Sequence, residues 1–514
     1  MTDRFARTDG STTHPCNLEE KLYCGGTWKG TMSHLDYIQG MGFDAVLISP
    51  INRNIEERTV YGEGYHGYWI EDLYSLNLHF GTHDDLLELS QALHNRGMFL
   101  MLDVVINNMA YPLNGSNPTT DIDYSAFNPF NEQSFYHPYC RIDDWNDYAQ
   151  SQYCWTGDTN VALPDLNTED ERVQAILEMW IQQMISTYEI DGLRIDAAKH
   201  ITPDFLRKFE ATADIFMFGE VYERTVDIIC GYQSNIMNSV TNYPIYFALL
   251  DAFTLGNINS LPDKVETMKN SCPSVTTLTI FTENHDNDRF ASMNNDMTLA
   301  KNIITFTLLF DGLPIIYQGQ EQHFSGTGDP YNREPIWPSA YNTSSPLYTV
   351  IRTLNAIRKH ATRLDPDNYP HYNTFPVFRG WYEMGFRKGR DGQQIVMVLS
   401  TKGSHGDAYT ITMADAFQSS IVVRDVLSCR TWTVNDKGEL WLDMDKGEPR
   451  VLFPEAAMRG SGLCGFGRNE GRNLDFIERF YAPGSGDEVS EGSISLNMGL
   501  RWTWFLCGLL GLIS

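Results

Sequence analysis

Short apolar runs recur along the first two thirds of the chain, and each of them ends in polar residues. They have the length of buried strands and occupy residues 43–50, 98–108, 190–200, 214–221, 277–286 and 313–321. Amphipathic stretches with helical spacing lie between them, at residues 82–97, 172–189 and 299–312. This alternation predicts a parallel α/β fold, because continuous apolar strands suit a sheet that is buried on both faces.

Two parallel architectures fit this alternation, a doubly wound sheet and a (β/α)8 TIM barrel. No GxGxxG loop directly follows an early strand, as it would in a dinucleotide-binding doubly wound sheet. In a barrel the active site gathers at the carboxyl ends of several strands, which is where the polar residues of these runs fall. We therefore predict a TIM barrel over residues 1–367.

The alternation lapses in three places. Residues 109–164 are rich in Asn, Pro, Tyr and Asp and are too long for a simple loop, which predicts a small domain inserted after the third strand. From residue 368 the pattern changes to period two, which predicts a C-terminal antiparallel β-sandwich domain over residues 368–464. Residues 465–514 begin polar and Gly-rich, which is typical of a disordered stalk.

The charge balance limits the partners of this protein. The 514 residues include 38 basic and 66 acidic side chains, for a net charge of −28. Nucleic acids and anionic membranes need a basic patch, so neither is an expected partner. A soluble protein that acts on a neutral substrate fits this composition, and we expect it to be a monomer.

The cysteines favour an oxidising compartment. Nine are present without a CxxC pair, and the first eight fall into local pairs that we would join as 16–24, 140–154, 230–272 and 429–464. Eight cysteines allow about a hundred connectivities, so counting alone does not settle this choice. Four disulfides would place the protein outside the cytosol. Two sequons, at Asn114 and Asn342, predict glycosylation.

The two ends of the chain conflict in what they predict about secretion. Small residues at 484–486, a polar spacer and the apolar stretch 502–514 have the order of a GPI-anchor signal, which predicts attachment to the cell surface or cell wall. The apolar stretch is too short for an ordinary transmembrane helix. No apolar secretion signal follows Met1, so we expect the sequence to lack its true N-terminus.

The candidate site comes from the polar ends of the apolar runs. Asp196, Glu220 and Asp286 end three separate runs, and Arg194 precedes the first of these acids. Glycoside hydrolysis needs two carboxyl groups, one that is ionised and attacks the anomeric carbon and one that is protonated and donates to the leaving oxygen. An Arg beside the first acid would keep it ionised. One such acid alone would be read as a surface group, but three at separate strand ends favour a glycosidase.

Longer motifs carry a resemblance to a known family. They are "DVVINN" (103–108), "GLRIDAAKH" (192–200), "GEV" (219–221) and "FTENHD" (281–286). In this order and spacing the chain resembles the α-amylase family of glycoside hydrolases, most closely the fungal α-amylases. The resemblance covers about residues 2–464 and also implies the four cysteine pairs named above.

The resemblance implies a role for each residue of the site. Asp196 would be the nucleophile that forms a covalent glycosyl-enzyme, Glu220 the general acid/base, and Asp286 the group that stabilises the transition state, with Arg194 orienting Asp196. The cleavage subsite would be completed by His66, Tyr68, His285, Asp329 and Arg333. Lys199 and His200 would form the next subsite. The expected substrate is an α-1,4-glucan or a maltooligosaccharide.

The resemblance also implies a structural Ca²⁺ between the barrel and the inserted domain. Asn107, Asp165 and the backbone carbonyl of His200 match the pattern of its oxygen ligands. Gln152 stands where fungal α-amylases have Glu. Loss of that carboxylate predicts weaker calcium binding, because affinity follows the charge of the ligands.

Two further departures from the family pattern carry predictions. Asn108 stands where the family has a His that contacts substrate, which predicts weaker transition-state binding. The same exchange, with an anchor signal, resembles fungal amylase-like 4-α-glucanotransferases of cell-wall α-glucan synthesis. The alternative is a catalytically weak, wall-anchored glucan-binding protein. The first barrel strand is largely missing ahead of "TDRF", so we expect the chain to fold poorly.

Overall fold

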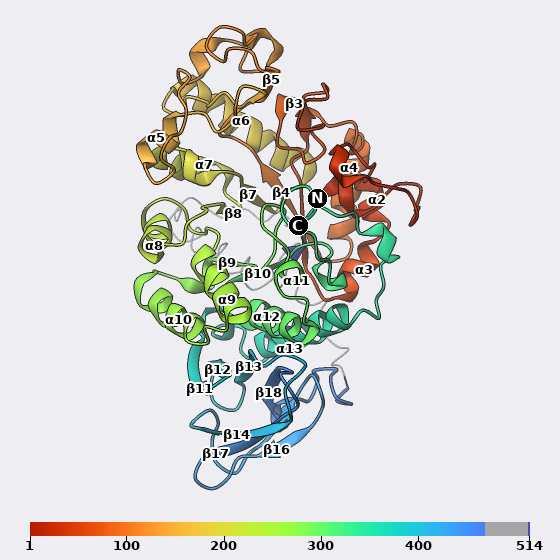
Figure 1. Cartoon of the computed structure of the whole chain (residues 1–514), viewed down its shortest axis with the longest axis vertical. Coiled ribbons are helices and arrows are strands. Elements are labelled where there is room, and N and C mark those ends of the chain that lie inside the picture. Colours follow the sequence, from red (N-terminus) through yellow and green to blue (C-terminus); the bar gives the residue numbers. More distant parts are fainter. Residues whose placement is uncertain (468–511, 514) are drawn as a thin grey trace, which may run out of the picture.

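A parallel sheet forms the centre of the computed structural model, which describes residues 1–467 and 512–513 (Figure 1). Its strands follow the order β8-β7-β4-β1-β19-β10-β9, and all neighbours are parallel. Their bounds are β1 Ala45–Ile48, β4 Phe99–Val104, β7 Gly192–Ile195, β8 Phe216–Gly219, β9 Thr279–Ile280, β10 Leu313–Ile316 and β19 Leu512–Ile513.

The sheet closes on itself through residues 240–241. Gly219 at the end of β8 bridges Val240, and Thr241 bridges Thr279 of β9, both in parallel. With this segment as the eighth member, the described strands form the ring of a (β/α)8 barrel, as predicted from the alternation. The place between β1 and β10 is taken by β19, whose Leu512 pairs with both strands. The expectation of a missing strand did not foresee this, because it considered only the segment before "TDRF".

Helices surround the ring. The longer ones are α4 His83–His94, α6 Glu171–Tyr188, α7 Pro203–Ala213, α8 Val226–Asn235, α9 Tyr243–Leu255, α10 Ser260–Ser271, α12 Met297–Leu309 and α13 Pro346–Leu364. The shorter ones are α1 Thr2–Phe5, α2 Trp28–Met32, α3 Leu35–Gly40, α5 Tyr148–Tyr153 and α11 Phe290–Met293. In α6, Asp170 caps the first turn, and Val173, Leu177 and Trp180 are buried at helical spacing.

The chain between β4 and α6 forms the predicted insertion. It contains α5 and the short antiparallel pair β5 Tyr111–Pro112 and β6 Val161–Ala162. Another hairpin, β2 Asn52–Asn54 with β3 Ile70–Leu76, lies between β1 and α4. Both insertions follow the carboxyl ends of barrel strands, so they stand over the same end of the barrel as the candidate site.

The C-terminal region is a pair of antiparallel sheets, as predicted. The larger contains β11 Phe375–Arg379, β12 Glu383–Lys388, β13 Ile395–Ser400, β15 Val422–Asp425, β16 Thr431–Thr433 and β18 Arg450–Pro454. The smaller pairs β14 Tyr409–Ala414 with β17 Glu439–Met444. Apolar side chains from both sheets form one buried cluster, with Val398 of β13 and Leu442 of β17 among them. A buried ion pair, Lys388 with Asp311, joins this region to the barrel.

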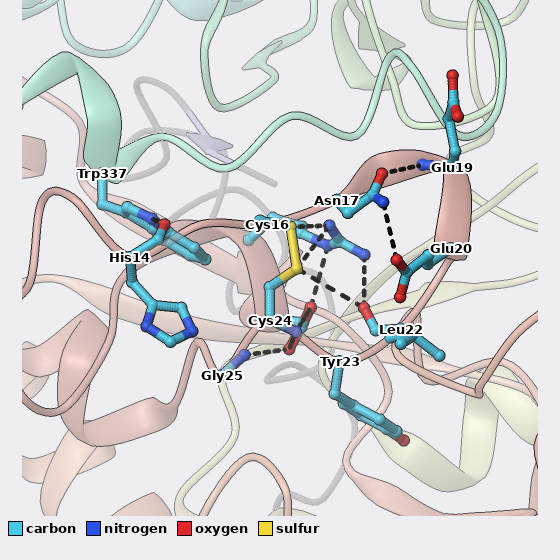
Figure 2. The surroundings of a disulfide bond; sticks show 12 residues. His14, Cys16, Asn17, Glu19, Glu20, Leu22, Tyr23, Cys24, Gly25 and Trp337 are labelled. Carbon is cyan, nitrogen blue, oxygen red and sulfur yellow. Dashed lines mark hydrogen bonds and ion pairs between the residues drawn. A yellow bond between two sulfur atoms is a disulfide. The ribbon is translucent and has the colours of Figure 1, made fainter.

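All four predicted disulfides are present: Cys16–Cys24, Cys140–Cys154, Cys230–Cys272 and Cys429–Cys464. Figure 2 shows the first of them, Cys16–Cys24. The Arg4 guanidinium donates to both of its sulfur atoms. Nearby, the Asn17 side chain donates to Glu20 at 2.9 Å and accepts from the backbone N–H of Glu19.

The predicted stalk and most of the predicted anchor signal, with Cys507, lie outside the described residues. Within the described part of the chain, no helix has both the length and the apolar character needed to cross a membrane. Asn114 and Asn342 are both exposed, and their glycosylation stays a prediction.

Candidate active site

Arg194 is the centre of the acidic cluster at the carboxyl ends of the strands. It lies on β7, and its Nη1 is 3.0 Å from Asp196 Oδ1. Its Nη2 is 3.0 Å from Oε2 of Glu220, which follows β8. Nη1 also contacts Asp103 of β4, with 2.7 Å to each carboxylate oxygen. Three neighbouring parallel strands therefore bring three carboxyl groups around one guanidinium.

A strained backbone residue connects the two predicted catalytic acids. Ala197, which directly follows Asp196, has φ 49° and ψ 35°, in the left-handed region. This conformation lets its N–H donate to Glu220 Oε2 at 3.3 Å. Glu220 thus accepts from both the Arg194 guanidinium and the backbone N–H beside Asp196, which limits the rotation of its side chain.

Asp286 contacts two basic side chains of its own, those of His285 and Arg333. Its Oδ2 is 3.4 Å from Nε2 of His285, and its Oδ1 is 3.5 Å from Nη2 of Arg333. Arg333 also donates from Nε to the His285 carbonyl at 3.0 Å, which fixes this turn. Its Nη1 is 3.0 Å from Asp329 Oδ1. The structure therefore brings three residues predicted for the cleavage subsite together with Asp286.

Aromatic rings form one wall of this cleft. Tyr68 stacks on His285 with ring centroids 5.2 Å apart, and its hydroxyl donates to Asp103 Oδ2 at 2.7 Å. His66 is buried and accepts from the Tyr68 backbone N–H at Nδ1. Tyr68, Asp103, Arg194, Glu220 and His285 line a common cleft. Tyr68 also stacks on His66, with ring centroids 5.7 Å apart, so three rings lie in a row along this wall.

Burial raises the pKa of both predicted catalytic carboxyl groups to about 7. For Asp196, Arg194 opposes this shift, whereas Asp103 and Asp286 add to it. The expectation that Arg194 keeps Asp196 ionised is therefore incomplete, because one guanidinium is divided among three acids. The cluster retains a proton near neutral pH, as an acid/base pair requires.

The pKa values of Asp286 and His285 shift in the opposite direction. Burial opposes the ionisation of Asp286, but His285, Arg333 and Arg194 lower its pKa below the usual range. Burial lowers the pKa of His285 to about 3, which makes its ring neutral at physiological pH. The third acid is thus the one held ionised, as a group that binds sugar hydroxyls would be.

The predicted second subsite lies on the short helical turn 198–200. Lys199 is buried and has its Nζ 3.7 Å from Glu223 Oε2. The Nδ1–H of His200 donates to the Ser151 carbonyl of α5 at 2.9 Å. This turn therefore joins the barrel to the inserted domain directly beside the cleft.

The predicted calcium ligands meet at this same junction in part. Asp165 Oδ1 is buried without a hydrogen-bond partner, and its Oδ2 accepts from His137 at 2.7 Å. Burial raises the pKa of Asp165 to about 7. The described residues contain no cluster of three or more His, Cys, Asp or Glu side chains that could hold a metal. The orphaned carboxylate oxygen of Asp165, beside the Asn107 side chain, is a hard oxygen ligand of the kind that Ca²⁺ takes.

Asn108 lies beside Asn107 at that junction. Its side chain is buried, its Nδ2 donates to the Met109 carbonyl at 3.2 Å, and its Oδ1 accepts from Asn107 at 3.5 Å. Its backbone bridges Asp165. The amide is thus held by its own neighbours.

Two acids outside the predicted catalytic set lie near the cleft. The pair of bonds from Arg194 makes Asp103 part of the cluster, a role that the sequence motifs did not predict. The signal was its position, since it ends β4 as Asp196 and Glu220 follow the ends of their strands. Glu283 also borders the cleft, but its carboxylate forms a buried ion pair with Arg289 at 3.0 Å, so its role in "FTENHD" is structural.

The chain matches known proteins over nearly all of its described part. The family described as "Alpha amylase, catalytic domain" matches residues 1–335, and "Alpha-amylase, domain C" matches residues 376–472. Alpha-amylase 2 of Schwanniomyces occidentalis is 43% identical over 468 residues, which is 91% of each chain. An α-amylase structure from Malbranchea cinnamomea aligns with a TM-score of 0.86 at 44% identity, over 90% of this chain and 97% of that one. CldA, a cyclomaltodextrin glucanotransferase, gives 0.76 at 25% identity, over 88% and 97%.

The barrel ring and the acids gathered at its strand ends define a glycoside hydrolase. The matches to both family domains and the 43% identity give the particular family. The chain belongs to the α-amylase family and is a glycosidase of starch-like glucans.

Proposed function

We propose that the protein cleaves α-1,4-glucosidic bonds with retention and passes the glycosyl group to another glucan, as a 4-α-glucanotransferase. The observation that carries the proposal is the pair Asp196 and Glu220 on the two nitrogens of Arg194. Both have a pKa of about 7, so one proton is available to the pair. Only the acid that faces the leaving oxygen can donate it usefully.

The first step forms a bond between Asp196 and the anomeric carbon. As the carboxylate attacks, the glycosidic bond breaks, and Glu220 gives its proton to the departing oxygen. Positive charge that develops on the sugar ring is offset by the ionised Asp286. Tyr68 and the neutral His285 hold the ring in place without competing for that charge.

The second step decides between transfer and hydrolysis. The Glu220 carboxylate takes a proton from the 4-hydroxyl of an acceptor glucan, whose oxygen attacks the anomeric carbon while the bond to Asp196 breaks. Water in the same place gives hydrolysis. Two observations support transfer. Asn108 replaces the family's His, and a protein named a glucanotransferase shares this fold at 25% identity.

A Ca²⁺ ion held by Asp165, Asn107, Gln152 and the His200 carbonyl belongs to the proposal. When bound, it would supply positive charge that fixes the inserted domain to the turn carrying Lys199.

Secretion and attachment to the cell wall are also proposed, supported by four disulfides and by the predicted anchor signal at 484–514.

The test is a time course of product lengths from maltoheptaose. Products longer than the starting oligomer support transfer, and exclusively shorter products contradict it. If the wild-type protein forms no product, the result contradicts enzymatic activity and supports the alternative of a glucan-binding protein. The Glu220→Gln variant gives the background. The Asn108→His variant is expected to shift the products toward hydrolysis, whereas an unchanged ratio would remove Asn108 from the argument.

A further inference from the structure

A buried tyrosine bonds two charged residues of the predicted cleavage subsite. Only 1% of the Tyr65 surface is exposed, so this side chain cannot touch a sugar in the cleft. Its hydroxyl oxygen is 3.3 Å from Asp329 Oδ1 and 3.3 Å from Nη1 of Arg333. A phenol has one proton to donate and an oxygen that also accepts. Tyr65 therefore donates to the Asp329 carboxylate and accepts from the Arg333 guanidinium at the same time.

The Tyr65 hydroxyl keeps the proton that this arrangement needs. Burial raises the pKa of Tyr65, although the positive charges of Arg333 and Arg4 oppose the shift. Because the phenol stays neutral, it bonds both charged partners without adding a charge beside them. Arg333 Nη1 and Asp329 Oδ1 also lie 3.0 Å apart, so the three side chains form a closed triangle. A triangle of bonds restricts each side chain more than a single ion pair would.

The ring of Tyr65 is itself fixed by a second arginine. Arg4 is fully buried, and its guanidinium carbon lies 4.1 Å from the centre of the Tyr65 ring. Arg4 pairs in turn with Asp3 at 3.0 Å and donates to the Leu22 carbonyl at 2.9 Å. Leu22 belongs to the loop closed by Cys16–Cys24, whose sulfur atoms also accept from Arg4. The ring therefore lies against a well-held support, which limits the movement of its hydroxyl.

The contacts of Arg333 lead from Tyr65 to the catalytic acids. Its Nη2 is 3.5 Å from Asp286 Oδ1, and its Nε donates to the His285 carbonyl at 3.0 Å. A shift of Arg333 would therefore move both the Asp286 carboxylate and the turn that carries it. A displacement of about 1 Å can cost a large factor in rate even when its origin lies away from the reacting atoms.

We propose that Tyr65 is a positioning residue of the cleavage subsite, whose hydroxyl holds Arg333 and Asp329 where they orient Asp286. This inference rests on the proposed function, because Asp286 is the acid that offsets positive charge in the first step. The effect of Tyr65 passes through Arg333, since Tyr65 itself does not reach the substrate. A role in packing alone would need only the ring, which phenylalanine also has.

The experiment uses Tyr65→Phe, which removes the hydroxyl and keeps the ring against Arg4. Loss of maltoheptaose is followed, so the result does not depend on the ratio of transfer to hydrolysis. kcat/KM should decrease about tenfold, because a hydrogen bond to charged groups is lost, while the melting temperature stays close to that of the wild type. Tyr348→Phe is the matched control. It removes another buried hydroxyl, which donates to the Tyr37 carbonyl of α3 at 3.0 Å, and should leave kcat/KM unchanged.

A double-variant cycle tests whether the effect passes through Arg333. In the Arg333→Lys background, Tyr65→Phe should change kcat/KM by about twofold or less, because the group that it positions is already altered. Effects that simply multiply would contradict a positioning role. A kcat/KM of Tyr65→Phe equal to that of the wild type would overturn the inference, even if the melting temperature falls, because the hydroxyl would then serve stability alone.

A second measurement applies if the wild type does not cleave maltoheptaose. Its affinity for maltoheptaose is then compared with that of Tyr65→Phe by titration calorimetry. A weaker affinity in the variant supports the positioning of Arg333 and Asp329 at a sugar site although the proposed function has failed. Equal affinities contradict it.

Discussion

One nitrogen of Arg194 holds both carboxylate oxygens of Asp103, each at 2.7 Å. The negative charge of Asp103 raises the pKa of Asp196. Replacing Asp103 with Asn should lower that pKa, so the acid side of the pH–activity profile should move to lower pH. Looser positioning of Arg194 should reduce kcat about tenfold.

Tyr68→Phe is the control for this prediction. It removes the hydrogen bond to Asp103 but leaves the carboxylate charge, so the acid side of the profile should not move. An unshifted profile in Asp103→Asn would show that this acid serves only to position Arg194.

Removing either catalytic carboxyl group should abolish turnover. Asp196→Asn cannot form the ester, and Glu220→Gln cannot donate a proton, so each should lower kcat by about a thousandfold or more. Both side chains are confined in a crowded acidic cluster, so the melting temperature should hold or rise. The exposed Asp263, paired with Arg379 on the surface, gives a control in Asp263→Asn. Substantial activity in either catalytic variant would refute the assignment.

Stability should decrease as pH rises, partly because of Glu210. Burial raises the pKa of this carboxyl group from 4.5 to about 7 in the folded protein. The folded state thus binds the proton more tightly than the unfolded chain, and the stabilisation present below pH 4.5 is lost as pH rises through about 7. Glu210→Gln should flatten this decrease when unfolding is followed at pH 5 and pH 8. Asp204→Asn, on the same helix and 90% exposed, should not.

The buried pair Lys388–Asp311 should hold the C-terminal region to the barrel. Both side chains are 2% exposed, and Asp311 also accepts from the backbone N–H and the hydroxyl of Thr374. Lys388→Met leaves the carboxylate buried without its cation, which should cost about 3–5 kcal/mol in chemical denaturation. Adding Asp311→Leu should recover part of the loss, and a single variant as stable as the wild type would exclude the pair as a clamp.

Restoring a carboxylate at position 152 should strengthen calcium binding. Gln152→Glu adds a negative oxygen at a position where the family resemblance implies a calcium ligand, so calcium should raise the melting temperature of the variant more than that of the wild type. The measurement is a calcium titration of chelator-treated protein followed by thermal unfolding. Gln150→Glu, two residues away in α5, controls for a general effect of charge. Equal responses of Gln152→Glu and the wild type would place the ion elsewhere.

Most of the barrel and the C-terminal sheets could be predicted because their apolar residues recur with the period of the element they form. The acids at positions 103, 196 and 220 were visible for the same reason, since each stands at or beyond the end of an apolar run. Roles that depend on a distant partner were less accessible. Only the folded chain shows that Glu283 turns toward Arg289, or that Asp103 shares the guanidinium with the catalytic pair.

Two features lay beyond any local pattern. The strand Leu512–Ile513 pairs with residues hundreds of positions earlier, and no periodicity of a two-residue strand indicates such a partner. The pKa of Asp196 depends on how one positive charge is divided among three acids. That division depends on how the side chains pack, so the presence of Arg194 near Asp196 in the sequence was not enough to predict the pKa of Asp196.

The left-handed conformation of Ala197 has a consequence for how this enzyme can be improved. A residue with a side chain pays about 1 kcal/mol to stand there, and glycine would relieve that strain. Ala197→Gly would therefore make a more stable protein, yet it would also free the backbone N–H that steadies Glu220. At this peptide unit, a substitution that increases the stability of the protein is therefore expected to decrease its turnover.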